Sequence, residues 1–584
     1  MSHYQALGVS RRRLFAGVLC FGLVVVPPTA AATDQGRDHL SPRSPAGGVA
    51  GELIQPRGGP ATDGGMQVLV EALRGLILVD AIGEVVPKQV TGVDLSALDF
   101  PAQDQLSLLL APYIGKPLSL SLLDQINRDI VAFGREQDRL VVDAFAPEGQ
   151  DITAGVVHIM VVSGKRGAAR LEGQPVASAD RFLRQSVIGA GDVILESALR
   201  SDLRWFNRNP FRRVNVILER GAEFGETDLI YEVDRGRPVR VYGAVEDSGT
   251  PLSGQERWLT GLNWGNAFGF EHQFNYQFTS SFDTDVVNAH SFSYTAPLSW
   301  RHELTVFGSH VDSVPELSDP LFALEGKTWQ LGFRYRVPLT DRFGVQHELS
   351  AGYEFKRSNN DLEFGRLRVS NTTTVISHFV VGHRASWTDR FGITTSDLSL
   401  FLSPGDMYSD NRDFRFEASR ARASADYMYL IANLQRDTPL PFDLHWMSRG
   451  EFQVSNENLL GSEQLGLGGF RSVRGYDRFD VASDIGLVIQ NEIALAPFSL
   501  LRLINSEIAQ DNFRPFAFMD YGLGRSRHRL PGEPTNHLWS AGLGFRYDLA
   551  GYMNVRCSYG WQLKDLPQSA VSSGRLHFSV MLAY

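Results

Sequence analysis

Three arginines and four glycines lie together in GLGGFRSVRGYDRFD, residues 466–480. A guanidinium carries five donors in a planar fork and seeks a carboxylate. Glycine permits positive φ and close backbone approach, so this cluster predicts a chain that folds back on itself. A buried, unpaired guanidinium would be costly, so a buried arginine here would need an acidic partner. The residues of this predicted motif are Gly468, Gly469, Val473, Arg474, Gly475 and Tyr476.

A candidate partner lies about fifty residues downstream, in RPFAFMDYGLG, residues 514–524. Alternation along a strand would place Ala517, Met519, Tyr521 and Leu523 on one face. Phe518, Asp520 and Gly522 would then share the other face. We expect Asp520 to pair with Arg474 on an inner wall. A solvated surface loop with incidental arginines is the alternative that composition alone leaves open.

Other residue patterns that could carry chemistry are incomplete. RHEL (301–304) and QHEL (346–349) lack the second histidine of HExxH, so His302 and His347 are expected to be polar residues facing a barrel lumen. The chain has no GxSxG, no GxxxxGK[ST] and only two cysteines, Cys20 and Cys557. The net charge of −10 argues against a nucleic-acid partner. We therefore expect no enzymatic activity, no metal and no cofactor.

Residues 239–584 alternate between apolar and polar side chains in segments longer than the strands of a soluble sandwich. Apolar positions facing out and polar positions facing in, with aromatics near strand ends, predict a transmembrane β-barrel. A soluble sandwich would also alternate, which leaves it as the alternative. The sixteen expected strands are 239–248, 255–265, 270–280, 286–296, 299–311, 327–338, 344–356, 373–386, 391–402, 420–435, 442–455, 483–496, 513–523, 537–549, 552–563 and 575–584.

The last expected strand ends on an aromatic residue. Its apolar face includes Phe578, Val580, Leu582 and Tyr584. A terminal strand of this kind fits the signal by which bacterial barrels are recognised for insertion, so these four residues are our candidate insertion signal. Cys557 falls on the expected lipid face and is predicted to be inert.

The N-terminal part has another organisation. Residues 1–32 carry a basic stretch, a short apolar run and small residues, which predicts a secretory signal peptide rather than an uncleaved anchor. Residues 33–70 are rich in Gly and Pro and predict a flexible periplasmic linker. Residues 71–163 and 164–238 each predict a β-α-α-β-β unit. In the first unit Leu123, Ile126, Ile130 and Phe133 form one apolar helix face.

The order of the expected strands predicts where the arginine motif lies in the barrel. If the N-terminal units are periplasmic, the first barrel strand runs outward and odd-to-even connections are extracellular. Residues 456–482 then form the sixth extracellular loop, between the eleventh and twelfth strands. An Arg474–Asp520 pair would fold this loop into the lumen.

Over residues 71–584 the chain resembles the two-partner secretion transporters, the haemolysin secretion/activation and filamentous haemagglutinin transporter family, within the barrel-assembly superfamily. GLGGFRSVRGY resembles the family's loop motif and FMDYG its inner-wall motif. PEGQDITAG through VSGK and NRNPFRRVNVILERGAEFGETDLIYEV resemble the ends of two polypeptide-transport-associated (POTRA) repeats. EDSGTPLSGQERWLTGLNWGNAFGFEHQFNYQF resembles the first barrel hairpin.

The resemblance implies two POTRA repeats, residues 71–163 and 164–238, a sixteen-stranded antiparallel barrel, residues 239–584, and an outer-membrane location with periplasmic N-terminal domains. It implies export of one large partner exoprotein of adhesin or haemolysin type. Outer-membrane lipid and the barrel-assembly machinery are further expected partners. A superfamily assembly factor and a passive porin or receptor are the alternatives. Residues 33–67 show no amphipathic helix of the kind that plugs some family members.

Overall fold

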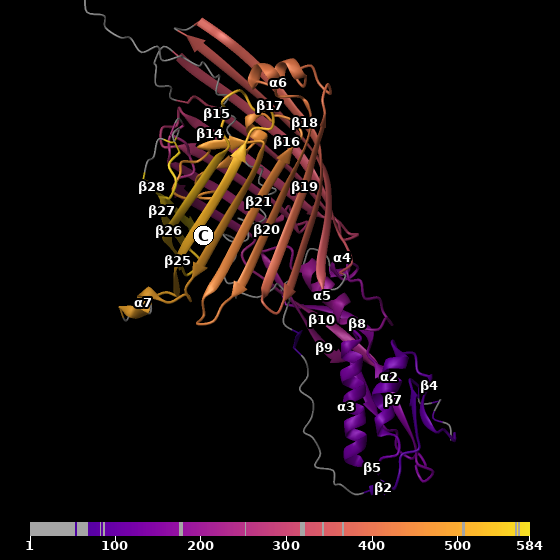
Figure 1. The fold of residues 1–584 in the computed structure, drawn as a ribbon. Helices are drawn as coiled ribbons and strands as arrows, with labels where there is room; N and C mark the ends of the chain where they lie inside the picture. The colour runs from indigo at the N-terminus through magenta and orange to yellow at the C-terminus, as the bar shows by residue number, and fades with distance from the viewer. Residues whose placement is uncertain are drawn as a thin grey trace, which may run out of the picture.

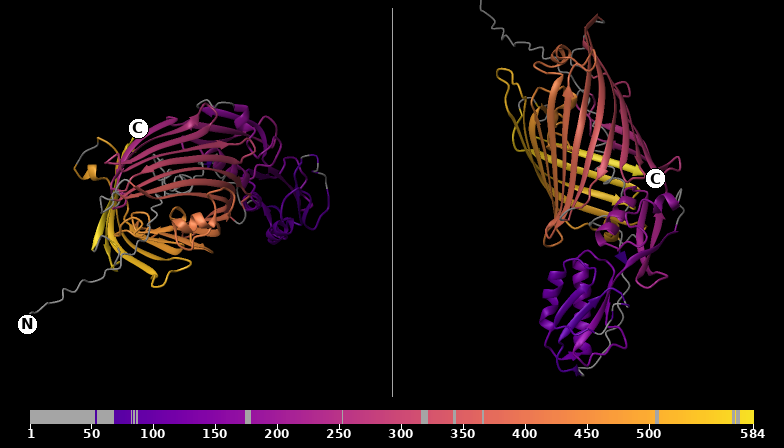
Figure 2. Two further views of the ribbon diagram at one scale, coloured as in Figure 1. Left: turned by 90° about the horizontal axis from the view of Figure 1, so that it is seen from above. Right: turned by 90° about the vertical axis from the view of Figure 1, so that its right-hand side faces the viewer.

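The computed structural model describes Leu53–Ile54 and residues 68–584, except for 82, 84, 86–87, 174–178, 252, 316–321, 342–343, 365–366, 505–507, 567–568 and 570–572. The predicted signal peptide and most of the predicted linker lie outside the described residues. Two α+β units lead into a large β-barrel, and the units extend from one end of it (Figure 1). The two further views show the same order, with the first unit farthest from the barrel (Figure 2).

Residues 239–583 form a closed antiparallel barrel, and its sixteen strands confirm the predicted number and order. Each strand pairs with its sequence neighbour among these sixteen, and the last pairs with the first from Tyr242↔Ala583 to Glu246↔Ser579. The strands are β11 (Val239–Glu246), β12 (Arg257–Ala267), β13 (His272–Ser281), β14 (Val287–Pro297), β15 (Glu303–Ser313), β16 (Phe322–Pro338), β17 (Val345–Phe364), β18 (Leu367–Asp389), β19 (Gly392–Pro404), β20 (Asp426–Pro439), β21 (His445–Ser455), β24 (Ile485–Ala494), β25 (Asp511–Arg525), β26 (Asn536–Leu549), β27 (Met553–Gln562) and β28 (Gly574–Ala583).

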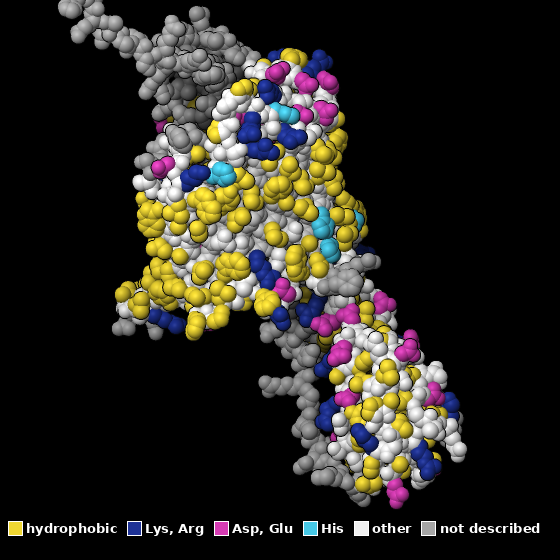
Figure 3. Space-filling model, viewed as in Figure 1, with side chains coloured by type: hydrophobic (Ala, Val, Ile, Leu, Met, Phe, Trp, Pro, Cys, Tyr) yellow, Lys and Arg dark blue, Asp and Glu magenta, His cyan; other side chains and the backbone are white. Residues whose placement is uncertain are grey.

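The alternation that predicted the strands decides which way each side chain faces. On β26, Trp539 and Leu543 are exposed on the outer surface, whereas the interleaved Ser540 and Gly542 are buried. Side chains of the first kind form an apolar belt around the visible face of the barrel, with charged side chains above and below it (Figure 3). This belt is the surface that a bilayer covers. No helix among the described residues has the length and apolar character needed to cross a membrane.

The outward positions of β28, together with Tyr584 directly after it, include the four residues of the candidate insertion signal. Val580, Leu582 and Tyr584 are exposed and Phe578 is half-buried on this face. Their role in insertion stays a prediction. The lumen position expected for His347 is wrong, because His347 shares a strand face with the exposed Leu349 and lies 3.2 Å from His383. His302 contacts the hydroxyl of Tyr335 at 2.6 Å, just before β15.

The first unit packs a four-stranded sheet, in the order β4-β3-β7-β6, against its helices. The apolar face of α3 is buried in this core as the sequence predicted, and the Ser119 side chain caps α3 by accepting from the Leu122 amide at 3.2 Å. The predicted β-α-α-β-β order omits β4, whose Val93 and Leu95 alternate with polar residues. The elements are β2 (Val68–Val70), β3 (Gly75–Val79), β4 (Gly92–Ala97), α2 (Gln103–Leu110), η2 (Ala111–Tyr113), β5 (Leu118–Ser119), α3 (Leu120–Glu136), β6 (Val142–Phe145) and β7 (Val156–Ser163).

The second unit follows the predicted order, and its sheet runs β1-β9-β10-β8. Strand β1 comes from the segment predicted to be a flexible linker and pairs in parallel with β9. Strand β2 of the first unit also begins inside that predicted linker and pairs with β5. The linker prediction is therefore wrong at these two short strands. The elements are β1 (Leu53–Ile54), β8 (Lys165–Gly173), α4 (Ala179–Leu183), α5 (Glu196–Phe206), β9 (Arg212–Arg220) and β10 (Glu226–Arg235).

Candidate functional site

Residues 456–484 join β21 to β24, and we call this segment the lumen loop. It contains η3 (Gly461–Glu463) and a short hairpin of β22 (Leu465–Leu467) and β23 (Val481–Ser483). At the tip, Gly468 has φ 101°, and a Cβ there would lie 2.1 Å from the carbonyl oxygen of Asp477. Only glycine fits such a position. The glycines noted in the sequence thus let the tip double back on itself.

The tip carries Arg474 to the inner wall of the barrel. The Arg474 Nε donates to Asp520 Oδ2 at 2.7 Å and its Nη2 donates to Oδ1 at 2.8 Å. The Arg474 amide donates to the same carboxylate at 3.1 Å. Asp520 on β25 is fully buried and Arg474 is 5% exposed. The guanidinium also lies 3.6 Å from the ring centroid of Phe518. The two residues paired from the sequence are therefore in bidentate contact.

A second carboxylate at this site was missed by the sequence reading. Glu492 on β24 is 3% exposed, and its Oε2 lies 3.3 Å from Arg474 Nη1. Its other oxygen pairs with Arg546 of β26. Two guanidiniums and two carboxylates thus balance in charge, which a buried cluster requires. The available signal was the position of Glu492 between Ile489 and Ile493, on the polar face of its strand.

Gly475 lets the tip approach the wall backbone to backbone. It has φ 94°, and a Cβ there would lie 2.8 Å from the carbonyl oxygen of Gly560 on β27. Its amide donates to Nε2 of His577 at 3.1 Å, and its carbonyl accepts from the Gln562 side chain at 2.8 Å. Three neighbouring inner-wall residues thus hold one glycine of the loop.

The remaining motif residues pack the tip in place. Tyr476 is fully buried, and its hydroxyl lies 2.5 Å from the carbonyl oxygen of Lys564 and accepts from the Trp539 amide at 3.2 Å. Val473 is also fully buried and lies against Gly522, where a Cβ would come within 2.7 Å of its Cγ2 atom. The wall motif therefore supplies a ring, a carboxylate and a space for the valine.

The limb of the loop that precedes the tip has another anchor, which the sequence reading did not find. Glu463 is 5% exposed, and Lys356 of β17 donates to it at 2.6 Å. The Tyr429 hydroxyl of β20 also donates to Glu463, at 2.7 Å. Lys356 lies 3.6 Å from Glu354, which contacts His378 of β18 at 3.3 Å. Since β17 and β18 are well separated in strand order from β25 and β27, the loop is tied to two parts of the wall.

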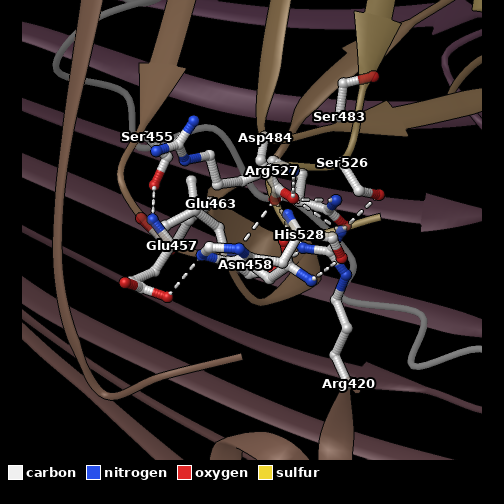
Figure 4. Close-up of polar contacts among 12 residues, drawn as sticks. Arg420, Ser455, Glu457, Asn458, Glu463, Ser483, Asp484, Ser526, Arg527 and His528 are labelled. Carbon is white, nitrogen blue, oxygen red and sulfur yellow. Dashed lines mark hydrogen bonds and ion pairs between the residues drawn. The ribbon is translucent and has the colours of Figure 1, made fainter. Parts of the chain in front are cut away.

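The root of the loop is held by Asp484, the residue before β24 (Figure 4). Arg420, at the end of α6 (Asp413–Ser419), donates two hydrogen bonds to its carboxylate at 2.6 and 2.9 Å. The amides of Leu459 and Arg527 donate to it at 3.0 Å each. Asp484 thus joins three connections at the same end of the barrel through one fully buried side chain.

The chemistry available to these anchors is electrostatic and mechanical. Within the described residues no group of three or more His, Cys, Asp or Glu side chains could hold a metal ion. The buried acids face arginine or lysine instead of a solvent pocket. The arrangement is suited to holding a loop inside a pore.

The second unit is fixed to the other end of the barrel, mainly through α5. The buried Asp202 of α5 accepts from Arg301, in the turn between β14 and β15, at 2.9 Å. Arg301 also donates to the Ser201 carbonyl at 2.6 Å. The Tyr231 hydroxyl donates to Asp202 at 3.2 Å. Burial, and then the Asp202 charge, raise the pKa of Tyr231, so its hydroxyl stays protonated in this contact.

Further arginines of this unit reach the neighbouring turns. Arg204 pairs with Asp341 at 2.5 Å, between β16 and β17. Arg212 pairs at 2.9 Å with Glu271, between β12 and β13. Three consecutive turns at one end of the barrel therefore contact the unit, whereas the lumen loop enters from the opposite end. If the units are periplasmic, the loop is extracellular in origin.

Comparison with known proteins places this architecture. The family model for "Haemolysin secretion/activation protein ShlB/FhaC/HecB" matches residues 225–547. The heme/hemopexin transporter protein HuxB of Haemophilus influenzae is 24% identical over 433 residues, which cover 72% of this chain and 73% of HuxB. The outer membrane transporter CdiB-2 of Burkholderia pseudomallei is 24% identical over 444 residues, 72% of this chain and 70% of CdiB-2.

Two solved structures share the fold. CdiB from Escherichia coli superposes with a TM-score of 0.71 at 18% identity, covering 94% of this chain and 96% of CdiB. CdiB from Acinetobacter baumannii gives a TM-score of 0.64 at 16% identity, covering 95% and 96%. The family match spans more than half of the 584 residues and includes the lumen loop, Glu492 and Asp520. The chain is an outer-membrane protein that belongs to the haemolysin secretion/activation protein family ShlB/FhaC/HecB.

Proposed function

We propose that this chain is the outer-membrane transporter of a two-partner, type V secretion system, which exports one large exoprotein of adhesin or haemolysin type through its barrel. The observation that carries the proposal is a sixteen-stranded barrel with an anchored lumen loop, in a chain of this family. HuxB and CdiB-2 are named as transporters, which agrees with this role.

The two α+β units are proposed to be periplasmic POTRA domains, residues 71–163 and 164–238, that recognise the unfolded partner. Each unit contains a sheet and helices, and an extended chain can add to a sheet edge through main-chain hydrogen bonds. The second unit is docked on the barrel turns, so a segment bound there starts close to the mouth. Outer-membrane lipid and the barrel-assembly machinery are the further proposed partners, the latter during insertion.

The lumen is proposed to be the export path. Its inner wall is polar, so an extended polypeptide can find hydrogen-bonding groups there. The sequence has no nucleotide-binding loop, and we propose that folding of the partner outside the cell draws the chain outward. No catalytic role is proposed for any residue of this chain. Arg474 and Asp520 are proposed to hold the lumen loop in its resting position.

The experiment compares export in a strain that lacks this gene and in strains with Arg474→Ala or Asp520→Ala. We expect the deletion to leave the partner exoprotein in the periplasm, with other outer-membrane proteins at normal levels. Each substitution should reduce the exported fraction, since each leaves a buried charge without its main partner. Immunoblots of medium and periplasm measure this, and heat modifiability of the barrel on gels controls for folding.

A general loss of outer-membrane proteins in the deletion strain would contradict the proposal and support an assembly factor. Unchanged export after Asp520→Ala, with export abolished by Arg474→Ala, would contradict the assigned pair. The proposed energy source has its own test. A partner that cannot fold but is still exported at the normal rate would exclude folding as the driving force.

A further inference from the structure

The connection between β24 and β25 differs from the other turns at the end of the barrel that faces the second unit. The other turns at this end span six residues or fewer, as 339–344 does between β16 and β17, whereas this connection runs over residues 495–510. It includes the one-turn helix α7 (Leu500–Leu503). Figure 1 and the left view of Figure 2 show α7 reaching sideways, away from the barrel wall. Short turns are usual at the periplasmic end of such barrels, so the extension calls for an explanation.

Three large apolar side chains on this connection are highly exposed. Leu503 is 71% exposed, Ile504 is 72% exposed and Ile508 is 93% exposed. Leu543, in the lipid-facing belt of β26, is 58% exposed. In water each such side chain forgoes the favourable free energy that its burial would release. Side chains this exposed are expected where lipid or protein covers them.

Residues 499–502 of the connection are held in place rather than loosely tethered. The buried carboxylate of Asp511, at the start of β25, accepts from the Leu500 amide at 2.8 Å and the Leu501 amide at 3.2 Å. The Ser499 hydroxyl donates to the same carboxylate and accepts from the Arg502 amide at 3.0 Å. These contacts fix the first turn of α7, so the sideways direction of its apolar residues is set by the fold.

The apolar surface of the connection continues the belt of the barrel. Ile493 and Leu495 are both 48% exposed at the end of β24. Phe498 pairs with Phe513 through two backbone hydrogen bonds, with the ring centroids 5.4 Å apart. Phe513 in turn lies 5.2 Å from the ring of Phe545 on the outward face of β26. Aromatic contacts thus run from the lipid-facing wall to Phe498, two residues before α7.

We propose that residues 495–504 together with Ile508 form an interfacial foot, which inserts its apolar side chains into the periplasmic leaflet of the outer membrane. The occupant of this surface is phospholipid. The position at the rim of the belt, the fixed sideways direction and the continuity with the lipid-facing wall support it. The exposed Arg502 lies where it can meet the lipid phosphate groups. An apolar face with a basic neighbour is the pattern of in-plane membrane anchors.

The test uses the full chain reconstituted in vesicles of phosphatidylethanolamine and phosphatidylglycerol. In a background with Cys20→Ser and Cys557→Ser, single cysteines are introduced as Leu503→Cys, Ile508→Cys, Leu543→Cys and Phe224→Cys and labelled with a nitroxide. Collision rates with oxygen, which concentrates in lipid, and with a water-soluble nickel complex are then measured. Leu543 is the lipid control. Phe224 is the aqueous control, since it is 58% exposed on the turn between β9 and β10.

We expect the oxygen-to-nickel ratio at positions 503 and 508 to be several-fold higher than at 224 and to approach the value at 543. Ratios equal to that at 224 would overturn the proposal. Shielding of both positions from oxygen and nickel alike would also overturn it, because it would indicate a protein partner. Ile508 has so little contact with the protein that its substitution cannot disturb folding. If the label at position 503 disturbs folding, the measurement at position 508 still tests the proposal.

Discussion

Replacing Gly560 by alanine tests whether the tip of the lumen loop must touch the wall backbone to backbone. Gly560 lies on the inner face of β27, and a Cβ there would be 2.7 Å from the Gly475 amide nitrogen and 2.9 Å from the Arg474 carbonyl carbon. Ordinary contacts of this kind are about 3.5–4 Å. The atoms that would be hit are backbone, so a rotamer change cannot relieve the overlap.

The free-energy cost of Gly560→Ala depends on whether the barrel strand or the loop tip moves to relieve the overlap. Overpacking a close contact costs about 1–3 kcal/mol. Strand β27, which carries Gly560, is hydrogen-bonded to β26 and to β28 and cannot easily move. We therefore expect the loop tip, and not the strand, to move by about an ångström. That shift would lengthen the 2.7 Å contact between Arg474 and Asp520 beyond hydrogen-bonding distance. Separating a buried pair costs about 3–5 kcal/mol, which is enough to release the tip in most molecules.

The assay measures export of the partner exoprotein and protease sensitivity of the lumen loop in whole cells. We expect Gly560→Ala to reduce export and expose the loop, with the barrel still folded by heat modifiability. Gly450→Ala is the matched control, because it changes a barrel strand in the same way and a Cβ there meets nothing within 4 Å. Normal export and a protected loop in Gly560→Ala would refute the reasoning, since the tip would then tolerate a spacer at the wall.

Two other contacts give further predictions. Lys356→Met should free the first limb of the loop by leaving the Glu463 carboxylate without its cation, a cost of about 3–5 kcal/mol. Cross-linking of that limb to the wall measures this, and Arg384→Met, which breaks a wall pair with Asp397 that does not involve the loop, should leave the cross-link unchanged. Arg301→Met should loosen the second unit, because Asp202 is fully buried and loses its cationic partner. Pulsed electron–electron distances between unit and barrel should broaden, and a distribution as narrow as in the unsubstituted protein would contradict this.

The barrel was predictable because its signal is local and repeated. Alternation within each segment predicts which face of the strand a residue such as Leu543 occupies. Because each strand gives one such segment, the number of segments predicted the sixteen strands. Asp520 could be assigned to the inner wall for the same reason. Its pairing with Arg474 required one additional argument, that a buried guanidinium needs a carboxylate.

The other anchors depend on which strands face each other across the lumen, and a sequence pattern does not contain that information. Glu463 and Lys356 are more than a hundred residues apart, and nothing local marks either as the other's partner. Arg204 on α5 looks like part of a solvated helix face until the turn with Asp341 is placed against it. Short strands such as β4 were missed because a few alternating residues give a weak signal.

The anchored lumen loop also bears on the permeability of the cell envelope. A barrel of sixteen strands without an obstruction leaves an aqueous channel. Because the loop is anchored both at Lys356 and at Asp520, we expect an idle transporter to keep the outer membrane closed to bulky solutes. Cells that carry a released loop are therefore expected to become sensitive to antibiotics too large for ordinary porins, so each anchor preserves the barrier that surrounds the cell.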